Sequence, residues 1–173
     1  MNFYVVDKEY VRYLRSFDER VSDIDYENRL KPYIGIILEI NELKYYVPIS
    51  SYKPRYEKLK NDIDFFKIID PRTNQIYSAL NLNNMIPIED NYVRLLKYDN
   101  LREYRIFENE KDFEKFVLLL KKELHIINAN EALIRKNAIT LYKFKIEKPE
   151  TSMAKRCCDF RLLEQKCKEY KPN

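Results

Sequence analysis

The sequence predicts an α+β fold in which helices pack around an antiparallel sheet. The first half of the chain contains short segments rich in β-branched and aromatic residues, separated by turn residues. The second half contains longer segments whose apolar residues recur at helical spacing. A chain of 173 residues with 45% hydrophobic content suits one core, so we expect a single domain over residues 1–173.

The N-terminal part predicts a strand over residues 3–6, followed by a helix that Asp7 caps. The apolar residues at helical spacing in this helix are Tyr10, Val11, Leu14 and Phe17. Residues 21–31 are mostly polar and lack periodicity, which indicates a loop that leads to Pro32.

A β-hairpin is predicted next, with strands over residues 33–40 and 43–49 joined at Asn41 and Glu42. Gly35, the only glycine in the sequence, marks either a bulge or a close approach by a backbone or a ligand, and we favour the structural explanation. Further short strands are expected over residues 63–69, 76–82 and 85–88, with a turn over residues 70–74.

The second half predicts three helices. Asn109 is expected to cap the first, whose apolar face consists of Phe113, Phe116, Val117, Leu120, Leu124 and Ile127. The second covers residues 131–141, and a last short helix lies near residues 158–170.

Composition excludes several kinds of active site. One histidine, His125, is too few for a paired-histidine ribonuclease, and one glycine rules out a dinucleotide fingerprint or a P-loop. Cys157, Cys158 and Cys167 form no CxxC pair, so we expect neither a disulfide framework nor a zinc site. No metal, other cofactor or membrane segment is expected, and the charged start does not resemble a signal peptide, which favours a cytoplasmic protein.

The charge distribution suits a nucleic-acid-binding protein. Net charge is only +4, but Lys and Arg outnumber Asp and Glu in residues 133–173, and the chain has 15 tyrosines and 9 phenylalanines. Cations hold phosphates, and aromatic faces stack on unpaired bases. A solvated charged surface around an aromatic core explains the same composition, so this feature leaves both interpretations open.

Polar residues follow the predicted hairpin. In an extended segment Ser51, Lys53 and Arg55 would project to one side and Ser50 to the other, provided that Pro54 does not turn the chain first. Hydroxyl groups and a lysine at such a place can stabilise the charge that builds up when a ribose 2′-hydroxyl attacks the adjacent phosphorus. The pattern also occurs in ordinary turns, so by itself it does not establish an active site.

Several segments, in this order, resemble the ToxN/AbiQ family of type III toxin–antitoxin toxins. They are the opening Phe3-Tyr4, the predicted helix over residues 7–13, and residues 31–36 (KPYIGI), 46–54 (YVPISSYKP), 84–88 (NMIPI) and 158–164 (CDFRLLE). The resemblance implies a compact, strongly twisted antiparallel sheet, similar to the MazF/Kid barrel, with helices around it. It also implies a metal-independent endoribonuclease that cuts single-stranded, often adenine-rich RNA and leaves 2′,3′-cyclic phosphate and 5′-hydroxyl ends.

The partners that the resemblance implies are RNA molecules. The antitoxin would be a small RNA with pseudoknot repeats, which the toxin cuts into units and with which it closes into a ring. The substrate would be cellular or phage RNA, in phage defence or plasmid maintenance, and neither an antitoxin protein nor a membrane partner is expected. Two other functions stay open: a non-catalytic RNA-binding module, and a protein-binding inhibitor with a similar fold.

The resemblance assigns catalytic roles to Lys53, Ser51, Ser50, Lys31 and Tyr10, with Ser50 where some relatives have threonine. Tyr10 could instead pack under the sheet, and Lys31 could be an ordinary solvated lysine.

The RNA contacts that we expect are Tyr26, Arg29, Tyr33, Tyr52, Arg55, Lys143, Lys145, Lys155 and Arg156. The last four come from the basic C-terminal part and are expected to hold the antitoxin. Tyr52 and Tyr56 stand where relatives have proline and histidine, a difference that bears on base preference.

Overall fold

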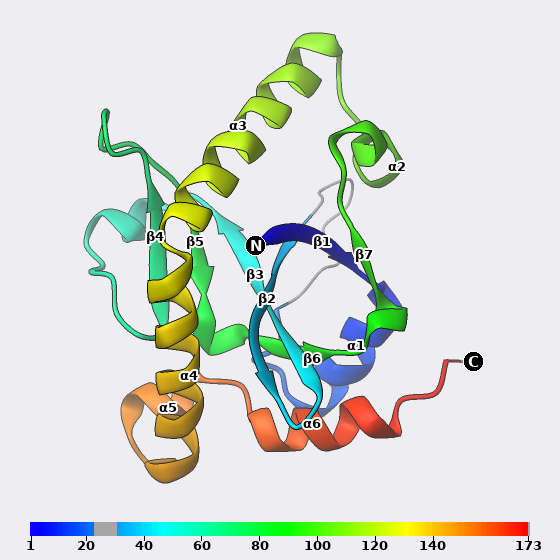
Figure 1. Cartoon of the computed structure of the whole chain (residues 1–173), viewed down its shortest axis with the longest axis vertical. Coiled ribbons are helices and arrows are strands. Elements are labelled where there is room, and N and C mark those ends of the chain that lie inside the picture. Colours follow the sequence, from blue (N-terminus) through cyan, green and yellow to red (C-terminus); the bar gives the residue numbers. More distant parts are fainter. Residues whose placement is uncertain (23–30, 173) are drawn as a thin grey trace.

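The computed structural model describes residues 1–22 and 31–172, and its centre is an antiparallel sheet of seven strands (Figure 1). The order of the strands is β4-β5-β3-β2-β1-β7, and β6 pairs with β3 beside this path. The strands are β1 (Asn2–Val6), β2 (Tyr33–Ile40), β3 (Leu43–Ser51), β4 (Phe65–Ile69), β5 (Ile76–Asn81), β6 (Ile86–Ile88) and β7 (Val93–Leu95). The predicted α+β class is confirmed.

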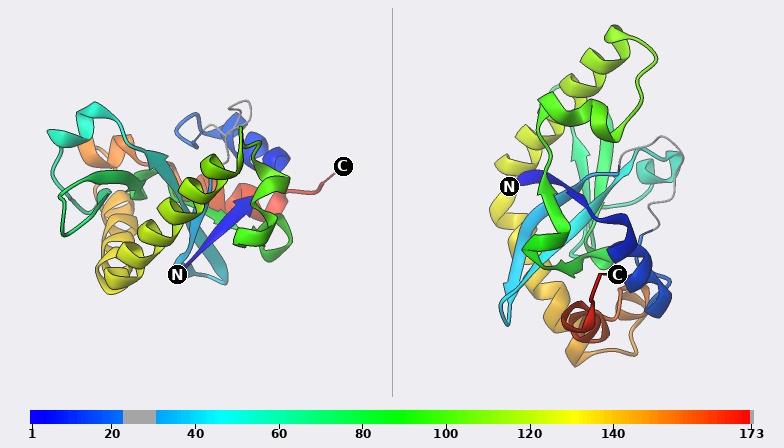
Figure 2. Two further views of the ribbon diagram at one scale, coloured as in Figure 1. Left: turned by 90° about the horizontal axis from the view of Figure 1, so that it is seen from above. Right: turned by 90° about the vertical axis from the view of Figure 1, so that its right-hand side faces the viewer.

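Helices pack around this sheet. They are α1 (Lys8–Phe17), α2 (Leu101–Tyr104), α3 (Glu110–Ala129), α4 (Glu131–Glu147), α5 (Ser152–Arg156) and α6 (Phe160–Glu169). The two predicted caps are present, because Asp7 accepts from Tyr10 N (2.9 Å) and Asn109 accepts from Asp112 N (3.0 Å). Figures 1 and 2 show α3 running beside β4 and β5, whereas α1 and α6 lie together near β6. α4 contacts β2.

β3 holds the sheet together because it has three partners. β2 pairs along one of its edges. On the other edge, β6 pairs with residues 44–46 and β5 pairs with residues 49–51. Among the described strands β4 and β7 are edges that do not pair with each other, so the sheet is open and the predicted closure into a barrel is not found.

The β2–β3 hairpin confirms the sequence prediction in detail. Its turn residues Asn41 and Glu42 both have positive φ, 50° and 66°, as a two-residue hairpin turn requires. A Cβ atom at Gly35 would overlap the ring of buried Tyr46, and the strand register also shifts between Ile34 and Leu38. The glycine is therefore explained by packing inside the sheet.

Most elements end close to where the sequence predicts, but α4 extends beyond residue 141 to Glu147. One polar side chain lies among the apolar ones on the inner side of α3, where Glu123 is buried with Leu120 and Ile127. The three cysteines are free thiols and all are buried. No helix within residues 1–22 and 31–172 is long and apolar enough to cross a membrane.

Candidate functional site

The end of β3 and the turn after it carry the polar residues that the sequence singles out. β3 ends at Ser51, Lys53 is still extended (φ −134°, ψ 140°), and Pro54 occupies the first turn of a short 3₁₀ helix, η1 (Pro54–Glu57). Because the strand stops before Pro54, its alternation does not reach Arg55. The shared direction of Ser51, Lys53 and Arg55 was expected only if Pro54 did not turn the chain first, and the structure has the turn at Pro54.

Tyr56 folds this turn back onto the strand. Its ring is fully buried, its hydroxyl donates to Ser50 Oγ over 2.7 Å, and its backbone N–H donates to the Lys53 carbonyl over 2.8 Å. One residue thus fixes both the Ser50 side chain and the Lys53 backbone. Because the Tyr56 hydroxyl is the donor, the hydrogen of Ser50 remains available for another acceptor.

Two further groups at this strand end are exposed and ready to bind. Ser51 and Lys53 are exposed, and the Ser51 hydroxyl and the Lys53 ammonium make no hydrogen bond or ion pair with any residue that the structure describes. Ser51 pairs with Ser78 of β5 and Ser50 pairs with Ala79, so the two serines project to opposite faces of the sheet. An anion at the strand end can be approached from both faces.

Lys31 lies beside the same strand end, although it is nineteen positions before Ser50 in the sequence. Ile49 N donates to the Pro32 carbonyl over 3.1 Å, and Tyr33 pairs with Pro48, so the segment before β2 runs antiparallel to the end of β3. This register places the Lys31 backbone next to Ser50. The backbones of four of the five predicted catalytic residues therefore lie close together at this strand end.

Tyr10 is in a different environment. Its side chain is completely buried, stacks on Tyr92 with 5.1 Å between ring centroids, and donates from its hydroxyl to the Pro87 carbonyl over 2.6 Å. Burial raises the pKa of the Tyr10 hydroxyl far above its ordinary value, with a smaller contribution from Cys167. This placement is the one that the core-packing interpretation of Tyr10 predicts.

The predicted aromatic and loop contacts are distributed unevenly. Tyr52 is exposed (44%) and its hydroxyl donates to Glu57 over 3.1 Å, a bond that raises the pKa of Tyr52. Tyr33 is only 1% exposed, so the structure does not support the predicted RNA contact of its ring; its place in β2 turns it into the core. Tyr26 and Arg29 lie outside the described residues.

The predicted C-terminal cations differ in whether they form hydrogen bonds or ion pairs within the protein. Lys145 is half-buried and donates to the Ala154 carbonyl (3.0 Å), which does not support its predicted contact with RNA. Lys155 is paired with Glu150 (3.1 Å), on the surface. Lys143 is exposed on α4 and has no ion pair with a described residue.

The remaining C-terminal cation, Arg156, lies in one pocket with Arg55, although a hundred residues separate them. We call this the η1–β4 pocket; its lining consists of Arg55, Leu59, Lys60, Asp62, Asp64, Phe65, Asn81, Asn83 and Arg156. Arg156 forms an ion pair with buried Asp64 over 2.8 Å. Two predicted RNA contacts are thus brought together near the strand end that carries Lys53.

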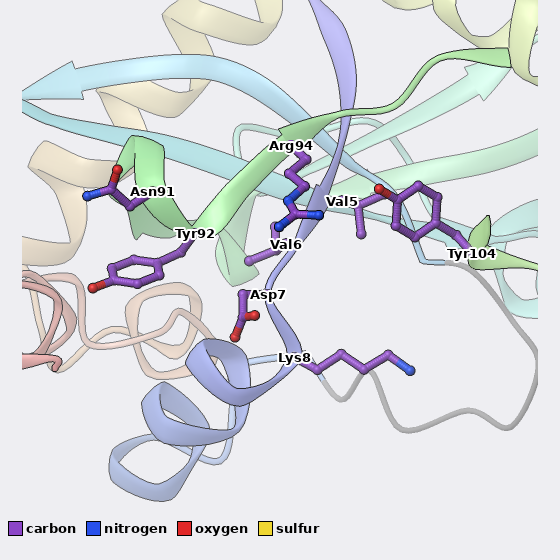
Figure 3. A pocket seen from close by; sticks show the side chains of 8 residues that line it. All are labelled: Val5, Val6, Asp7, Lys8, Asn91, Tyr92, Arg94 and Tyr104. Atoms are coloured by element: carbon purple, nitrogen blue, oxygen red, sulfur yellow. The ribbon is translucent and has the colours of Figure 1, made fainter. Parts of the chain in front are cut away.

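A second hollow contains cations that the sequence does not single out. Lys8 at the start of α1 and Arg94 on β7 are exposed, line the same pocket as Tyr104, and have no ion pair within the described part of the chain (Figure 3). Val5, Val6 and the exposed Asp7 also line it. β1 and β7 are almost ninety residues apart in the sequence but pair directly in the sheet. The proximity of Lys8 and Arg94 is therefore visible only in the structure.

A buried carboxyl group lies behind the strand end. Glu123 of α3 is 4% exposed and lies near Ser78, the strand partner of Ser51. Burial raises the pKa of Glu123 to about 7, against a smaller opposing effect of the Ser78 hydroxyl. Ser78 Oγ has no well-aligned hydrogen bond to a described residue, so the carboxyl group is the polar neighbour available to it. A glutamate on an otherwise apolar helix face is the sequence signal for this group.

Within the part of the chain that the structure describes, no group of three or more His, Cys, Asp or Glu side chains is placed to hold a metal ion. The chemistry that the strand end offers comes from hydroxyl and ammonium groups. Such donors bind a phosphate and stabilise additional negative charge on it.

The chain matches a family model. Residues 2–168 match the model of the toxin ToxN of type III toxin–antitoxin systems. The chain is 31% identical to the endoribonuclease ToxN of Pectobacterium atrosepticum over 98% of this chain and 94% of that protein. It is 28% identical to the endoribonuclease AbiQ of Lactococcus lactis subsp. lactis, over 98% of this chain and 89% of that protein.

Solved structures show the same similarity. A structure of AbiQ, a lactococcal anti-phage endoribonuclease of the type III toxin–antitoxin class, superimposes with a TM-score of 0.81 at 26% identity, over 98% of this chain and 96% of that one. A structure from a study of selective toxin inhibition by a non-coding RNA pseudoknot superimposes with a TM-score of 0.81 at 25% identity, over the full length of both chains.

Proposed function

The chain belongs to the ToxN family of type III toxin–antitoxin toxins, and on that premise we propose that the end of β3 is the active site of an endoribonuclease. The observation that carries the proposal is the convergence of Ser50, Ser51, Lys53 and Lys31 at one strand end. Together they bring two hydroxyl groups and two lysines to a strand end at which Ser51 and Lys53 are exposed. Such a set fits the scissile phosphate of an RNA strand.

The reaction that we propose needs no metal ion. The 2′-oxygen of a ribose attacks the adjacent phosphorus as its proton passes to solvent, and the bond from phosphorus to the 5′-oxygen of the next nucleotide breaks. Lys53 stabilises the negative charge on the phosphate and gives a proton to the departing 5′-oxygen. The products are a 2′,3′-cyclic phosphate and a 5′-hydroxyl group.

The serines hold the phosphate from two sides. Ser50 accepts from Tyr56, so its own hydrogen is available to a non-bridging oxygen. Ser51 approaches from the opposite face of the sheet, and Lys31 adds positive charge beside Ser50. Tyr10 is not in this set, because its hydroxyl is buried and donates to Pro87.

The partner of this toxin is an RNA antitoxin. A structural neighbour is inhibited by a non-coding RNA pseudoknot, and another belongs to an antiviral system that a processed non-coding RNA regulates. We propose the same relationship here, with toxin and RNA units closing into a ring, an antiviral role, and cytoplasmic RNA as the substrate. The exposed cations of the η1–β4 pocket and of the hollow at Lys8 and Arg94 are the surfaces that we expect RNA to contact.

The test is cleavage of a single-stranded, adenine-rich RNA by the purified protein in excess EDTA, with chemical mapping of the new ends. We expect 2′,3′-cyclic phosphate ends from the wild type and a loss of about 10²- to 10⁴-fold in rate for Lys53→Ala. The matched control is Lys58→Ala, because Lys58 is also exposed, follows in the same segment, and has no ion pair with a described residue.

The role of Lys53 as proton donor can be separated from its role as a cation. A substrate with sulfur in place of the 5′-bridging oxygen has a leaving group that departs without a proton. Cleavage of this substrate by Lys53→Ala should approach the wild-type rate if Lys53 is the proton donor.

In the cleavage assay with natural RNA, binding of RNA without any new ends would instead show a non-catalytic RNA-binding protein.

A further inference from the structure

We propose that the η1–β4 pocket binds one unpaired nucleobase of the RNA and prefers a base with an exocyclic amino group. The inference rests on the proposed ribonuclease function and adds a base-reading site to the phosphate-binding strand end. The volume of the pocket, about 460 Å³, lies within the range of sites for small molecules. It is large enough for a purine.

The pocket opens on the same side of the sheet as Ser50. Phe65 pairs with Asn81, Ala79 pairs with Ser50, and Asn81 and Ala79 are two residues apart in β5. Directly paired residues and every second residue along a strand share a face, so these side chains project to one side. The ring of Phe65 also packs on that of Tyr56, with 5.2 Å between centroids, and Tyr56 holds Ser50. The pocket and the strand end therefore form one continuous structure.

Flat groups suited to stacking line the pocket. The half-buried ring of Phe65 is one, and the guanidinium groups of Arg55 and Arg156 are the others. Arg156 is held in place by its ion pair with Asp64. Unpaired bases stack on aromatic rings and on guanidinium planes, and a pocket that offers both suits a base better than an isolated phosphate.

Hydrogen-bond acceptors face the edge of such a base. The side-chain amide of Asn81 makes no hydrogen bond to any described residue, and Asp62 uses one carboxylate oxygen to accept from Ile63 N, which leaves the other. These oxygens accept from an exocyclic amino group, while the amide N–H₂ of Asn81 donates to a ring nitrogen beside it. Uracil would present a carbonyl group to the same acceptors and would be disfavoured.

The test uses pentanucleotides of 2′-fluoroadenosine, which lack the attacking hydroxyl and so report binding alone. In a series of five, one adenine at a time is replaced by unsubstituted purine, which removes only the amino group. We expect one position at which the change weakens binding to the wild-type protein by about tenfold. Asn81→Leu should remove this difference, whereas Asn81→Asp, which keeps an acceptor, should retain it.

Asn137→Leu is the matched control, because Asn137 is half-buried like Asn81 and lies on α4, outside the η1–β4 pocket and outside the hollow at Lys8 and Arg94. The proposal is overturned if no position distinguishes adenine from purine, or if Asn81→Leu distinguishes them as the wild type does. If the wild type distinguishes adenine from purine but never cleaves natural RNA, the proposed ribonuclease function is refuted and the base pocket is supported. If it cleaves RNA but does not distinguish the two bases, the ribonuclease is supported and the base pocket is refuted.

Discussion

The hydroxyl group of Tyr56 donates a hydrogen bond of 2.7 Å to Ser50 Oγ from across the turn that Pro54 begins. This bond orients a residue of the proposed active site through one that does not itself face the RNA. Tyr56 is fully buried, so it acts as a positioning residue. The ring of Tyr56 also packs edge-on against the ring of Phe65, which lines the η1–β4 pocket.

Tyr56→Phe should therefore slow cleavage while leaving the fold largely intact. The variant keeps the buried ring and loses one hydrogen bond, which costs about 1 kcal/mol of unfolding free energy. We expect kcat/KM to fall about five- to tenfold because Ser50 is no longer fixed. If Ser50 mediates the effect, Tyr56→Phe will add little to Ser50→Ala in the double variant. Fully multiplicative losses would show that the two residues act independently.

A second prediction concerns Tyr10, to which the sequence resemblance assigns a role in the active site. Tyr10→Phe removes the donor to the buried Pro87 carbonyl, so we expect unfolding free energy to fall by about 1–2 kcal/mol. Cleavage per folded molecule should stay near the wild-type value, because this hydroxyl lies in the core. The measurements are denaturant unfolding and kcat/KM on one preparation. A loss of activity with unchanged stability would instead restore Tyr10 to the active site.

Local signals predict the early part of the fold well. The hairpin turn, the Asp7 and Asn109 caps and the packing role of Gly35 depend on neighbours in sequence or within one hairpin. β7 was not predicted because its three residues are half-exposed or exposed and become a strand only by pairing with β1. The open edge of the sheet likewise depends on pairings that no local pattern encodes.

The candidate site likewise contains residues that the sequence identifies and contacts that only the fold creates. The polar cluster at residues 50–55 can be seen in sequence, and the resemblance adds Lys31 to it. The convergence of Arg55 with Arg156 cannot be read from composition, since both lie among many cations. Composition also cannot show that Lys145 is bound by the protein's own backbone, so a basic segment overstates how many cations are available to RNA.

The buried carboxyl group of Glu123 predicts a specific dependence of stability on pH. Its pKa is raised to about 7 from an ordinary value of 4.5, so the folded protein holds this proton more tightly than the unfolded chain. The contribution of this bound proton to the unfolding free energy is fully present below pH 4.5. It is lost as the pH rises through 7, and the unfolding free energy then falls by an amount on the order of 3 kcal/mol.

Glu123→Gln keeps a polar side chain of the same size and cannot ionise. The difference in unfolding free energy between variant and wild type should therefore grow in favour of the variant from pH 5 to pH 8. Denaturant unfolding at several pH values measures it, and Glu103→Gln, at an exposed position on α2, is the control. A difference that stays constant with pH would show that Glu123 does not titrate in this range.

The last prediction concerns the hollow that Lys8 and Arg94 share. Both side chains are exposed and have no ion pair with a described residue, so binding of RNA there would release the counterions of two phosphates. Lys8→Ala/Arg94→Ala should weaken binding of the antitoxin RNA. The slope of log Kd against log salt concentration should fall by about 1.4 to 1.8, at roughly 0.7 per phosphate of a single strand and 0.9 per phosphate of a duplex. The control Lys44→Ala/Arg102→Ala removes the same charge from cations that are paired with Asp90 and Glu110. A slope that falls equally in both variants would reflect net charge alone, whereas a fall confined to Lys8 and Arg94 would place the RNA across this hollow, because only a direct contact releases counterions locally.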